Sequence, residues 1–451
     1  MREKRQRQMS LIPPEIDHPQ AKELEAISCA INSKSTICDR VMQDLSRLNP
    51  CDDRRGARGM SADQVLRAAI VKILFGFSYQ DLAFHLVDSK SIRRFCQIGI
   101  FDKGFQKSVL QKNIKAISHQ SWNAINQEVL AYAGDEKIEK GRQVRIDCTV
   151  VESNIHPPTD STLLWDTVRV LTRLLCHAKK DFGLRQLLFQ DHRRRAKRRM
   201  LAIQYAKSNK ARVPLYKDLL KVTNRCIGYA QRAVDMIEAS GAAPLSLLAL
   251  ACEIRHYARL GTQVVNQTER RVLRGESVPA SEKIVSVFEP HTDIIVKDRR
   301  DTFYGHKVCL AGGKSNLILD CLILKGNPAD TELTEIMLDR QKQLYGRYPL
   351  KAAFDGGFAS KANLRIAKSK EIKDVCFAKK RGLKETDMCR SLYVYKRLRR
   401  FRAGIESGIS WLKRTFAFDR CNWKGSKSFK KYVCATIVAA NLLTIARKQL
   451  A

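Results

Sequence analysis

The segment at residues 402–416, RAGIESGISWLKRTF, is the part of the chain most indicative of its fold. At about 100° per residue of an α-helix, Arg402, Glu406 and Lys413 fall within a sector of roughly 40°. An apolar stripe adjoins that sector and consists of Ile405, Ile409, Leu412 and Phe416. An acid held between two bases beside a core favours a positioned carboxylate. A surface ion-pair ladder on an amphipathic helix is the alternative.

Composition indicates a folded protein with an anionic partner. The chain has 451 residues, 44% of them hydrophobic, which is enough for two to four domains. Its 82 Lys and Arg against 46 Asp and Glu give a net charge of +36, and such a surplus favours nucleic acid. A membrane is not expected, because the longest apolar stretch, residues 433–445, is interrupted by Asn441 and predicts a buried terminal helix.

The cysteines indicate neither a disulfide framework nor a zinc site. The 14 cysteines form no CxxC pair and no Cys/His cluster with zinc spacing. We therefore expect reduced cysteines, a cytoplasmic protein and no secretory signal peptide.

Residues 1–140 are expected to form a helical N-terminal domain. A helix is predicted from Ser61 to the stop at Gly76, and two short helices follow around a DSKS turn. The second of these carries Arg93 and Arg94, which favours a helix-turn-helix-like DNA-binding module; an ordinary small helical bundle fits equally well.

The pattern changes to a strand after Gly141. In QVRIDCTVVESNI, residues Val144, Ile146, Cys148 and Val150 alternate with Arg145, Asp147 and Thr149. The sequence predicts a strand with an acid near its middle.

Residues 161–285 are predicted to form four long helices, inserted after that strand. The block DHRRRAKRRM at 191–200 is strongly basic and has no acids at i+4 to offset its charge. Phosphate contact is therefore predicted for its bases, which are Arg193, Arg194, Arg195, Lys197, Arg198 and Arg199.

Strand patterning resumes after Lys283. A hairpin is expected around the Gly-Gly-Lys-Ser turn at 312–315, then a helix, the strand LKAAFD, another helix and a short strand. A basic linker at 379–400 would lead into the helix that carries Glu406, and a last helix is predicted from Lys430 to Lys448.

Three acids stand out by position. Asp147 lies on the polar side of the first strand, Asp355 ends a strand before Gly356-Gly357, and Glu406 lies on the helix. Each alone has an ordinary explanation, a turn or a solvated face. Together they fit a site for two Mg²⁺ (or Mn²⁺) ions in phosphoryl transfer. Asp320 and Asp330 are rivals of Asp355, with a capping role likelier for Asp330, and Asp160 is the rival of Asp147.

The order of these elements resembles the ribonuclease-H-like core of DDE transposases. RAGIESGISWLK matches the R-x3-E-x6-K signature of bacterial insertion-sequence enzymes, and residues 61–95 are similar to their helical N-terminal domain. RIDCTVVESNIHPPTDSTLL and FRAGIE favour the ISNCY-type group. The implied fold is α/β, a ribonuclease-H-like mixed sheet flanked by helices. The catalytic domain would comprise residues 141–160 and 286–451, with the basic insertion domain at 161–285.

The resemblance also implies a function. Asp147, Asp355 and Glu406 would bind two metal ions in a transposase that binds the terminal inverted repeats of its insertion sequence. The enzyme would cleave the element ends by hydrolysis and join the 3′-hydroxyls to target DNA. Arg402 and Lys413 would contact DNA near the cleaved bond or form structural ion pairs. The expected partners are double-stranded DNA and a second copy of the chain, or a larger assembly, in a bacterial, nucleoid-associated setting.

Two features depart from the family pattern. The signature tyrosine three residues before Arg402 is replaced by Arg399, and the helical insertion follows the first acid rather than the second. The alternatives are a nuclease without strand transfer and a domesticated, non-catalytic DNA-binding regulator.

Overall fold

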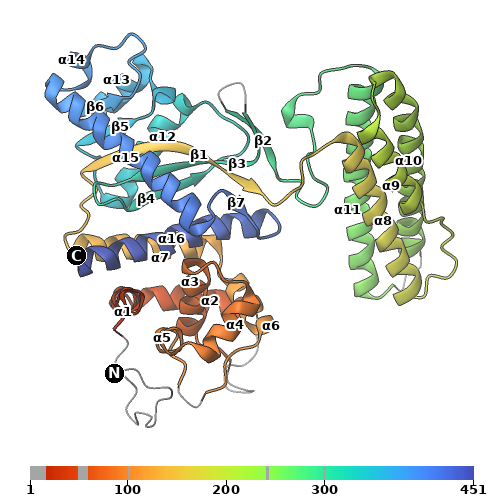
Figure 1. Cartoon of the computed structure of the whole chain (residues 1–451), viewed down its shortest axis with the longest axis horizontal. Helices are drawn as coiled ribbons and strands as arrows, with labels where there is room; N and C mark the ends of the chain where they lie inside the picture. Colours follow the sequence, from red (N-terminus) through yellow and green to blue (C-terminus); the bar gives the residue numbers. More distant parts are fainter. Residues whose placement is uncertain (1–16, 49–58, 100–101, 240–242, 298–300) are drawn as a thin grey trace, which may run out of the picture.

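A single mixed β-sheet forms the centre of the protein (Figure 1). The computed structural model describes residues 17–48, 59–99, 102–239, 243–297 and 301–451. Its strands are β1 (Gln143–Ser153), β2 (Asp293–Lys297), β3 (Asp301–Gly312), β4 (Ile318–Ile323), β5 (Lys351–Phe354), β6 (Asp374–Phe377) and β7 (Arg420–Cys421). The strand order is β2-β3-β1-β5-β6, with β4 also paired to β3 and β7 to β1.

The pairing directions fit a ribonuclease-H-like core. β1 is antiparallel to β3 and parallel to β5, which is in turn parallel to β6. β3 and β4 form the predicted antiparallel hairpin around Gly312. The expected fold class, a mixed sheet flanked by helices, is confirmed.

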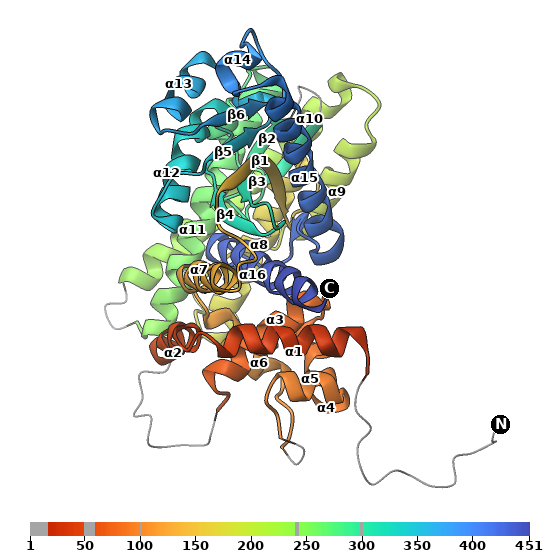
Figure 2. The ribbon, with the colours of Figure 1, turned by 90° about the vertical axis from the view of Figure 1, so that its left-hand side faces the viewer.

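Helices cover both faces of the sheet. Figure 2 shows α12 (Leu333–Tyr345) and α13 (Lys361–Ser369) on one side and α15 (Leu392–Phe416) on the other. The short helix α14 (Glu385–Met388) precedes α15. The predicted stripe of α15 is buried, as Ile405, Ile409, Leu412 and Phe416 all pack into the core.

Helix α15 begins ten residues before the predicted helix at 402, so the expected linker at 379–400 is partly wrong. Tyr395 and Leu398 extend the buried stripe toward the N-terminus, and Ser391 caps the helix by accepting a hydrogen bond from the Val394 amide. The many Lys and Arg residues of this segment lie on the remaining face, where they do not interrupt the helix.

Strand β1 is covered on both faces, unlike a half-exposed strand. Arg145, predicted on the polar side, is only 5% exposed. Its guanidinium donates a 3.0 Å hydrogen bond to the Phe401 carbonyl of α15 and lies 4.9 Å from the Phe401 ring centroid. The polar side of β1 is therefore the side that α15 covers.

Below the sheet in Figure 2, α16 (Ser426–Leu450) and α7 (His119–Asp135) lie between it and the N-terminal helices. The latter are α1 (Pro19–Asn32), α2 (Thr36–Leu48), α3 (Ala62–Leu74), α4 (Tyr79–Asp88), α5 (Lys90–Phe95) and α6 (Lys107–Ala116). Asn441 of α16 pairs with both backbone groups of Ile318, at 2.8 Å each. By length and composition α16 could cross a membrane, but 83% of its apolar window is buried inside the protein, as in a core helix.

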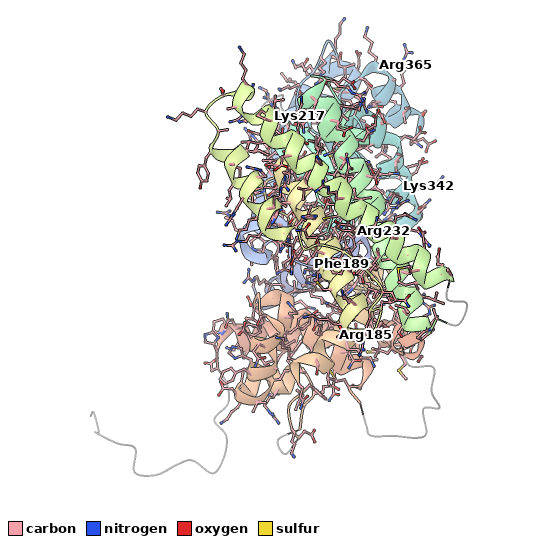
Figure 3. All side chains as sticks on the ribbon, turned by 90° about the vertical axis from the view of Figure 1, so that its right-hand side faces the viewer. Arg185, Phe189, Lys217, Arg232, Lys342 and Arg365 are labelled. Carbon is pink, nitrogen blue, oxygen red and sulfur yellow. The ribbon has the colours of Figure 1, made fainter. Side chains whose placement is uncertain are left out.

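The four predicted long helices between β1 and β2 are confirmed as a bundle with its own hydrophobic cluster, which stands beside the sheet in Figure 1 and faces the viewer in Figure 3. They are α8 (Asp160–Asp181), α9 (Arg193–Tyr205), α10 (Asn209–Ala239) and α11 (Leu245–Thr268). The second was expected from residue 184, but α9 begins only at Arg193, whose amide donates to the Asp191 carboxylate. Short helical turns lie at Glu269–Leu273, Ala280–Glu282, Asp330–Glu332 and Gly356–Phe358.

Candidate active site

The three predicted acids line one cavity of about 920 Å³. Strand pairing explains why two of them meet: Ile146 of β1 is the partner of Phe354 of β5, so the residues that follow, Asp147 and Asp355, emerge side by side. Glu406 comes from α15, which packs across β1, β5 and β6. Three elements distant in sequence therefore deliver one carboxylate each.

The guanidinium of Arg402 connects the three carboxylates. Its Nη2 lies 3.2 Å from Asp147 Oδ2 and 2.8 Å from Asp355 Oδ1, and its Nη1 lies 2.8 Å from Glu406 Oε1. The Arg402 side chain is only 14% exposed. The Arg402–Glu406 pair is the i,i+4 contact expected of a surface ion-pair ladder. Arg402 also pairs with Asp147 and Asp355, so three carboxylates from different elements meet at one guanidinium.

The three acids differ in their access to water. The side chains of Asp147, Asp355 and Glu406 are 14%, 38% and 59% exposed. Burial, reinforced by the negative charge of Asp355, raises the pKa of Asp147 to about 6, although Arg402 opposes the shift. A cation bound closer to Asp147 than Arg402 would therefore lower the pKa of this carboxyl group.

The Asp355-Gly356-Gly357 turn leaves the carboxylate available. Asp355 makes no side-chain capping hydrogen bond to the turn that follows it, so the ordinary turn-forming role does not apply. Neither glycine has a positive φ. They provide space instead: a Cβ at Gly357 would lie 2.3 Å from an oxygen of Asp330, and one at Gly356 would meet the Lys379 side chain.

Basic side chains line the same cavity. Lys413 was predicted here, and burial followed by the charge of Lys297 lowers its pKa. The other basic residues of this cavity were not predicted as site residues, and they are Lys297, Lys307, Lys379, Arg381 and Arg414. Lys379 and Arg381 lie in the basic segment 379–400 that leads into α15, which is a usable signal, whereas Lys297 and Lys307 come from strands whose pairing no local pattern encodes.

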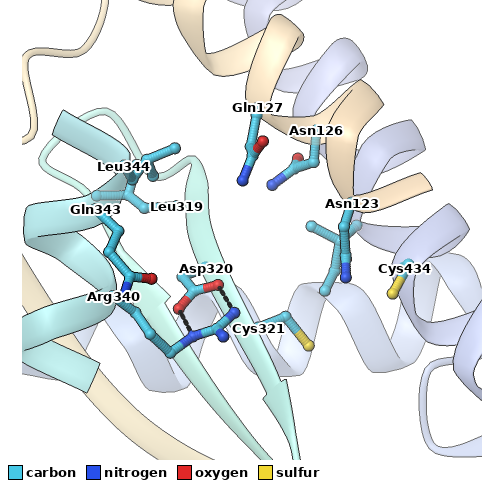
Figure 4. A pocket seen from close by; sticks show the side chains of 11 residues that line it. Asn123, Asn126, Gln127, Leu319, Asp320, Cys321, Arg340, Gln343, Leu344 and Cys434 are labelled. Atoms are coloured by element: carbon cyan, nitrogen blue, oxygen red, sulfur yellow. Dashed lines mark hydrogen bonds and ion pairs between the residues drawn. The ribbon is translucent and has the colours of Figure 1, made fainter. Parts of the chain in front are cut away.

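Each of the three rival acids is paired with a basic side chain, and two of them lie outside the cavity that contains the triad. Asp320 forms a two-point ion pair with Arg340, at 2.5 and 2.6 Å, in a different cavity lined by amide side chains (Figure 4). Asp160 pairs with Arg271 at 2.9 Å. Asp330 does line the triad cavity, pairs with Lys307 at 2.7 Å and makes no capping hydrogen bond, so its expected capping role is wrong.

Some of the predicted DNA-binding bases outside the cavity are paired with acids of the protein, and others are not, within the part of the chain that the structure describes. Arg193 pairs with Asp191, and both Arg195 and Arg199 pair with Asp218 of α10, so the offsetting acid comes from another helix. Exposed bases of α9 for which the described residues provide no ion pair are Arg194, Lys197 and Arg198. Arg93 donates to backbone carbonyls, including Leu86 at 3.0 Å, and the exposed Arg94 pairs with Glu25 at 3.2 Å.

The donor set suits a hard divalent cation, although its present arrangement is that of an ion-pair cluster. Within the described residues, no group of three His, Cys, Asp or Glu side chains has metal-binding geometry. The three carboxylates nevertheless share one cation, the Arg402 guanidinium, and carboxylate oxygens are what Mg²⁺ and Mn²⁺ prefer. Asp147, Asp355 and Glu406 therefore have the oxygen donors that such a cation needs, and the Arg402 guanidinium now occupies the position between them.

A comparison with family models identifies the segment that contains most of this site. Residues 290–442 match the Transposase DDE domain. The matched segment includes Asp355, Arg402 and Glu406, whereas Asp147 precedes it. No match was found among curated proteins or among solved structures. The match supports the resemblance of residues 290–442 to the catalytic domain of DDE transposases.

Proposed function

We propose that this chain is the DNA transposase of an insertion sequence, which binds the terminal inverted repeats, hydrolyses the phosphodiester at the element ends and joins the 3′-hydroxyls to target DNA. The observation that carries the proposal is the convergence of Asp147, Asp355 and Glu406 on one guanidinium in a basic cavity. The match of residues 290–442 to the Transposase DDE domain supports it. ISNCY-type membership and a bacterial, nucleoid-associated setting are part of the proposal.

In this proposal the three carboxylates hold two Mg²⁺ or Mn²⁺ ions. Bound divalent ions would lower the pKa of the attacking water or hydroxyl and stabilise the leaving oxygen. The residues of the chain would do the rest: the ionised Asp147 would be one of the carboxylates that hold the cation, and Arg402, released from the carboxylates, would donate to a phosphate oxygen. Lys413, which is half-buried and whose pKa is lowered by burial and by the charge of Lys297, would contact the same strand.

The remaining basic surfaces would hold the DNA outside the cleaved bond. Basic side chains around the acids would neutralise phosphates, and these are Lys297, Lys379, Arg381 and Arg414; Lys307 in the same cavity is already paired with Asp330. Residues 1–140, with Arg94 exposed on α5, would bind the terminal repeat, and the exposed bases of α9 in the 161–285 insertion would contact flanking duplex. Two copies of the chain would bring two ends together.

The test is a cleavage and joining reaction. The purified protein is incubated with labelled DNA from either side of the coding sequence, Mg²⁺ and a supercoiled target plasmid. The proposal expects a nick at the element boundary and labelled end joined to plasmid. Cleavage without joined product supports the nuclease instead, and DNA binding without cleavage at any Mg²⁺ or Mn²⁺ concentration supports the non-catalytic regulator.

A further inference from the structure

A second basic cavity lies where the four-helix bundle meets the sheet. It has a volume of about 620 Å³. Its charged and aromatic lining comes from α8, α9, α11 and the loops before β2 and α16, and includes Arg169, Arg173, Arg193, Tyr257, Phe288 and Lys424. None of these residues belongs to the acid cavity.

Strand pairing places this cavity near the end of β1. Ser153, the last residue of β1, pairs with Cys421 of β7, and Lys424 follows three residues later. Glu152 and Asp293 both pair with Gly305 of β3, and Phe288 lies five residues before Asp293. Ser153 lies six positions after Asp147 along β1, which is about 20 Å at roughly 3.3 Å per residue. The two cavities are thus distinct sites joined by one strand.

The cations of this cavity are incompletely neutralised. Arg173 and Lys424 are exposed, and the described residues provide neither an ion pair nor a hydrogen bond for their side chains. The acid in the lining, Glu289, is 6% exposed and already engaged. It accepts from the Gly425 amide at 2.9 Å and contacts His291 at 2.8 Å. The Glu289 carboxylate therefore interacts with these two partners and, in the described part of the chain, forms no ion pair with Arg173 or Lys424.

One guanidinium is also fixed in place by aromatic rings. Arg169 lies 4.8 Å from the Trp165 ring centroid and 5.1 Å from that of Phe288, and it pairs with Asp166 at 2.7 Å. Stacking of this kind holds a guanidinium plane while leaving its edge free to donate hydrogen bonds. Like charges gathered around a hollow repel one another, and an anion inside it would relieve that repulsion.

We propose that this cavity binds backbone phosphates of the DNA at a point separate from the reacting bond, with Arg173 and Lys424 as its principal contacts. The inference rests on the proposed function, because it takes its ligand from the same DNA substrate. Since Arg173 belongs to the bundle and Lys424 to the loop before α16, a phosphate held by both would fix the insertion against the sheet.

The test measures the salt dependence of DNA binding by the full-length protein. A fluorescent duplex from the DNA flanking the coding sequence is titrated without divalent metal, so that binding is measured in the absence of cleavage. Each phosphate contact contributes about 0.9 to the slope of log K against log salt concentration. The double variant Arg173→Ala/Lys424→Ala loses two such contacts, so the magnitude of its slope should be smaller than that of wild type by about two.

Two control variants distinguish the loss of the cavity contacts from a general loss of positive charge. Lys361→Ala with Arg365→Ala removes two exposed bases from α13 and should leave the slope unchanged. Arg173→Lys with Lys424→Arg keeps the charges and should retain most of the slope. Thermal melting of each variant checks that the fold is intact.

The inference and the proposed function fail in different ways. A slope for the Arg173/Lys424 variant equal to that of wild type overturns the inference, even where wild type cleaves and joins DNA. A changed self-association with an unchanged slope also overturns it, since the cavity then contacts a second copy of the chain. Absence of cleavage by wild type, with the slope still reduced by the double variant, overturns the proposed function and leaves a phosphate-binding cavity.

Discussion

The residue that organises the candidate active site is Arg402. Three carboxylates within reach of one another repel, and burial of Asp147 adds to the free-energy cost of keeping all three ionised. Arg402 offsets this cost by pairing with each of them. The basic residue of the RAGIE segment is thus the internal counter-ion of the triad, a role that its spacing from Glu406 alone does not reveal.

Replacing Asp147 should stabilise the protein near neutral pH. The folded protein retains the Asp147 proton up to about pH 6 against an ordinary pKa of 3.8, so the contribution of this group to stability falls as pH rises from about 4 to about 6. Above that window the ionised form costs about 3 kcal/mol, from 1.36 kcal/mol per pKa unit. Asp147→Asn should raise the melting temperature at pH 7.5 and have a smaller effect at pH 4.5. A variant less stable than wild type at pH 7.5 would contradict this assignment.

Replacing Arg402 should strengthen metal binding while abolishing cleavage. A divalent ion must displace the guanidinium in wild type, and that competition is removed in Arg402→Ala. Ion-pair energies of about 1 kcal/mol predict a roughly fivefold lower Kd for Mn²⁺ by calorimetry without DNA. Arg414→Ala, which removes another base from the same cavity, is the control and should bind Mn²⁺ nearly as wild type does. Weaker Mn²⁺ binding by Arg402→Ala would show that Arg402 supports the metal site instead of competing for it.

Metal binding should also depend on pH through Asp147. Because a metal ligand must be deprotonated, binding below the Asp147 pKa of about 6 releases a proton. The apparent Mn²⁺ affinity should fall about tenfold per pH unit below pH 6 and level off above it. Titrations from pH 5 to 8 in two buffers of different ionisation enthalpy measure both the affinity and the released proton. A flat profile across pH 6 would exclude Asp147 as a ligand.

At the scale of elements, α15 is fixed against β1 by a buried arginine. A Cβ at Gly404 would lie 1.9 Å from Arg145 Nη1, and that guanidinium is held by Phe401 and Asn316. Glycine at 404 therefore lets the helix approach the strand closely enough to bring Glu406 to Asp147. The glycine of RAGIE has a packing function, since its φ is helical.

Two glycine substitutions on α15 should have opposite effects. Gly404→Ala should destabilise the protein by about 1–3 kcal/mol, as overpacking does, and reduce cleavage by shifting Glu406. Gly408→Ala adds a Cβ with no atom within 4 Å and should stabilise the helix by up to about 1 kcal/mol. Chemical denaturation of both variants measures the difference. Equal effects at the two positions would contradict the packing of Arg145 against Gly404.

Local patterns predicted these elements well, whereas contacts between distant segments escaped them. The stripe from Ile405 to Phe416 and the strand around Asp147 follow directly from periodicity. The start of α15 was missed because Lys and Arg dominate residues 396–400, although Tyr395 and Leu398 continue the stripe. The pairing of Arg195 and Arg199 with Asp218 depends on how α9 packs on α10, which no spacing within α9 encodes.

For the whole molecule, the sequence predicted the order of the parts better than their contacts. Element order and the change of period at Gly141 indicated the mixed sheet and the inserted bundle, and the Transposase DDE domain match agrees with that fold. The shared core of the N-terminal helices, α16 and one face of the sheet was not predicted, because it joins residues 24–133 to residues 429–446. Hydrophobic patterns mark a face as buried without identifying what covers it.

The proposed function depends on Asp147, Asp355 and Glu406 acting together as a metal-dependent site for DNA cleavage. The most direct test is the initial rate of Mg²⁺-dependent nicking of flanking DNA by wild type, Asp355→Asn and Asp320→Asn, each checked for an unchanged melting profile. Asp355→Asn should lower the rate at least about a hundredfold, since mutation of residues that merely support metal ligands already lowers activity roughly 10- to 100-fold. Asp320→Asn should retain a nearly normal rate, because its carboxylate pairs with Arg340 outside the site. Full activity of Asp355→Asn would exclude Asp355 from the metal site.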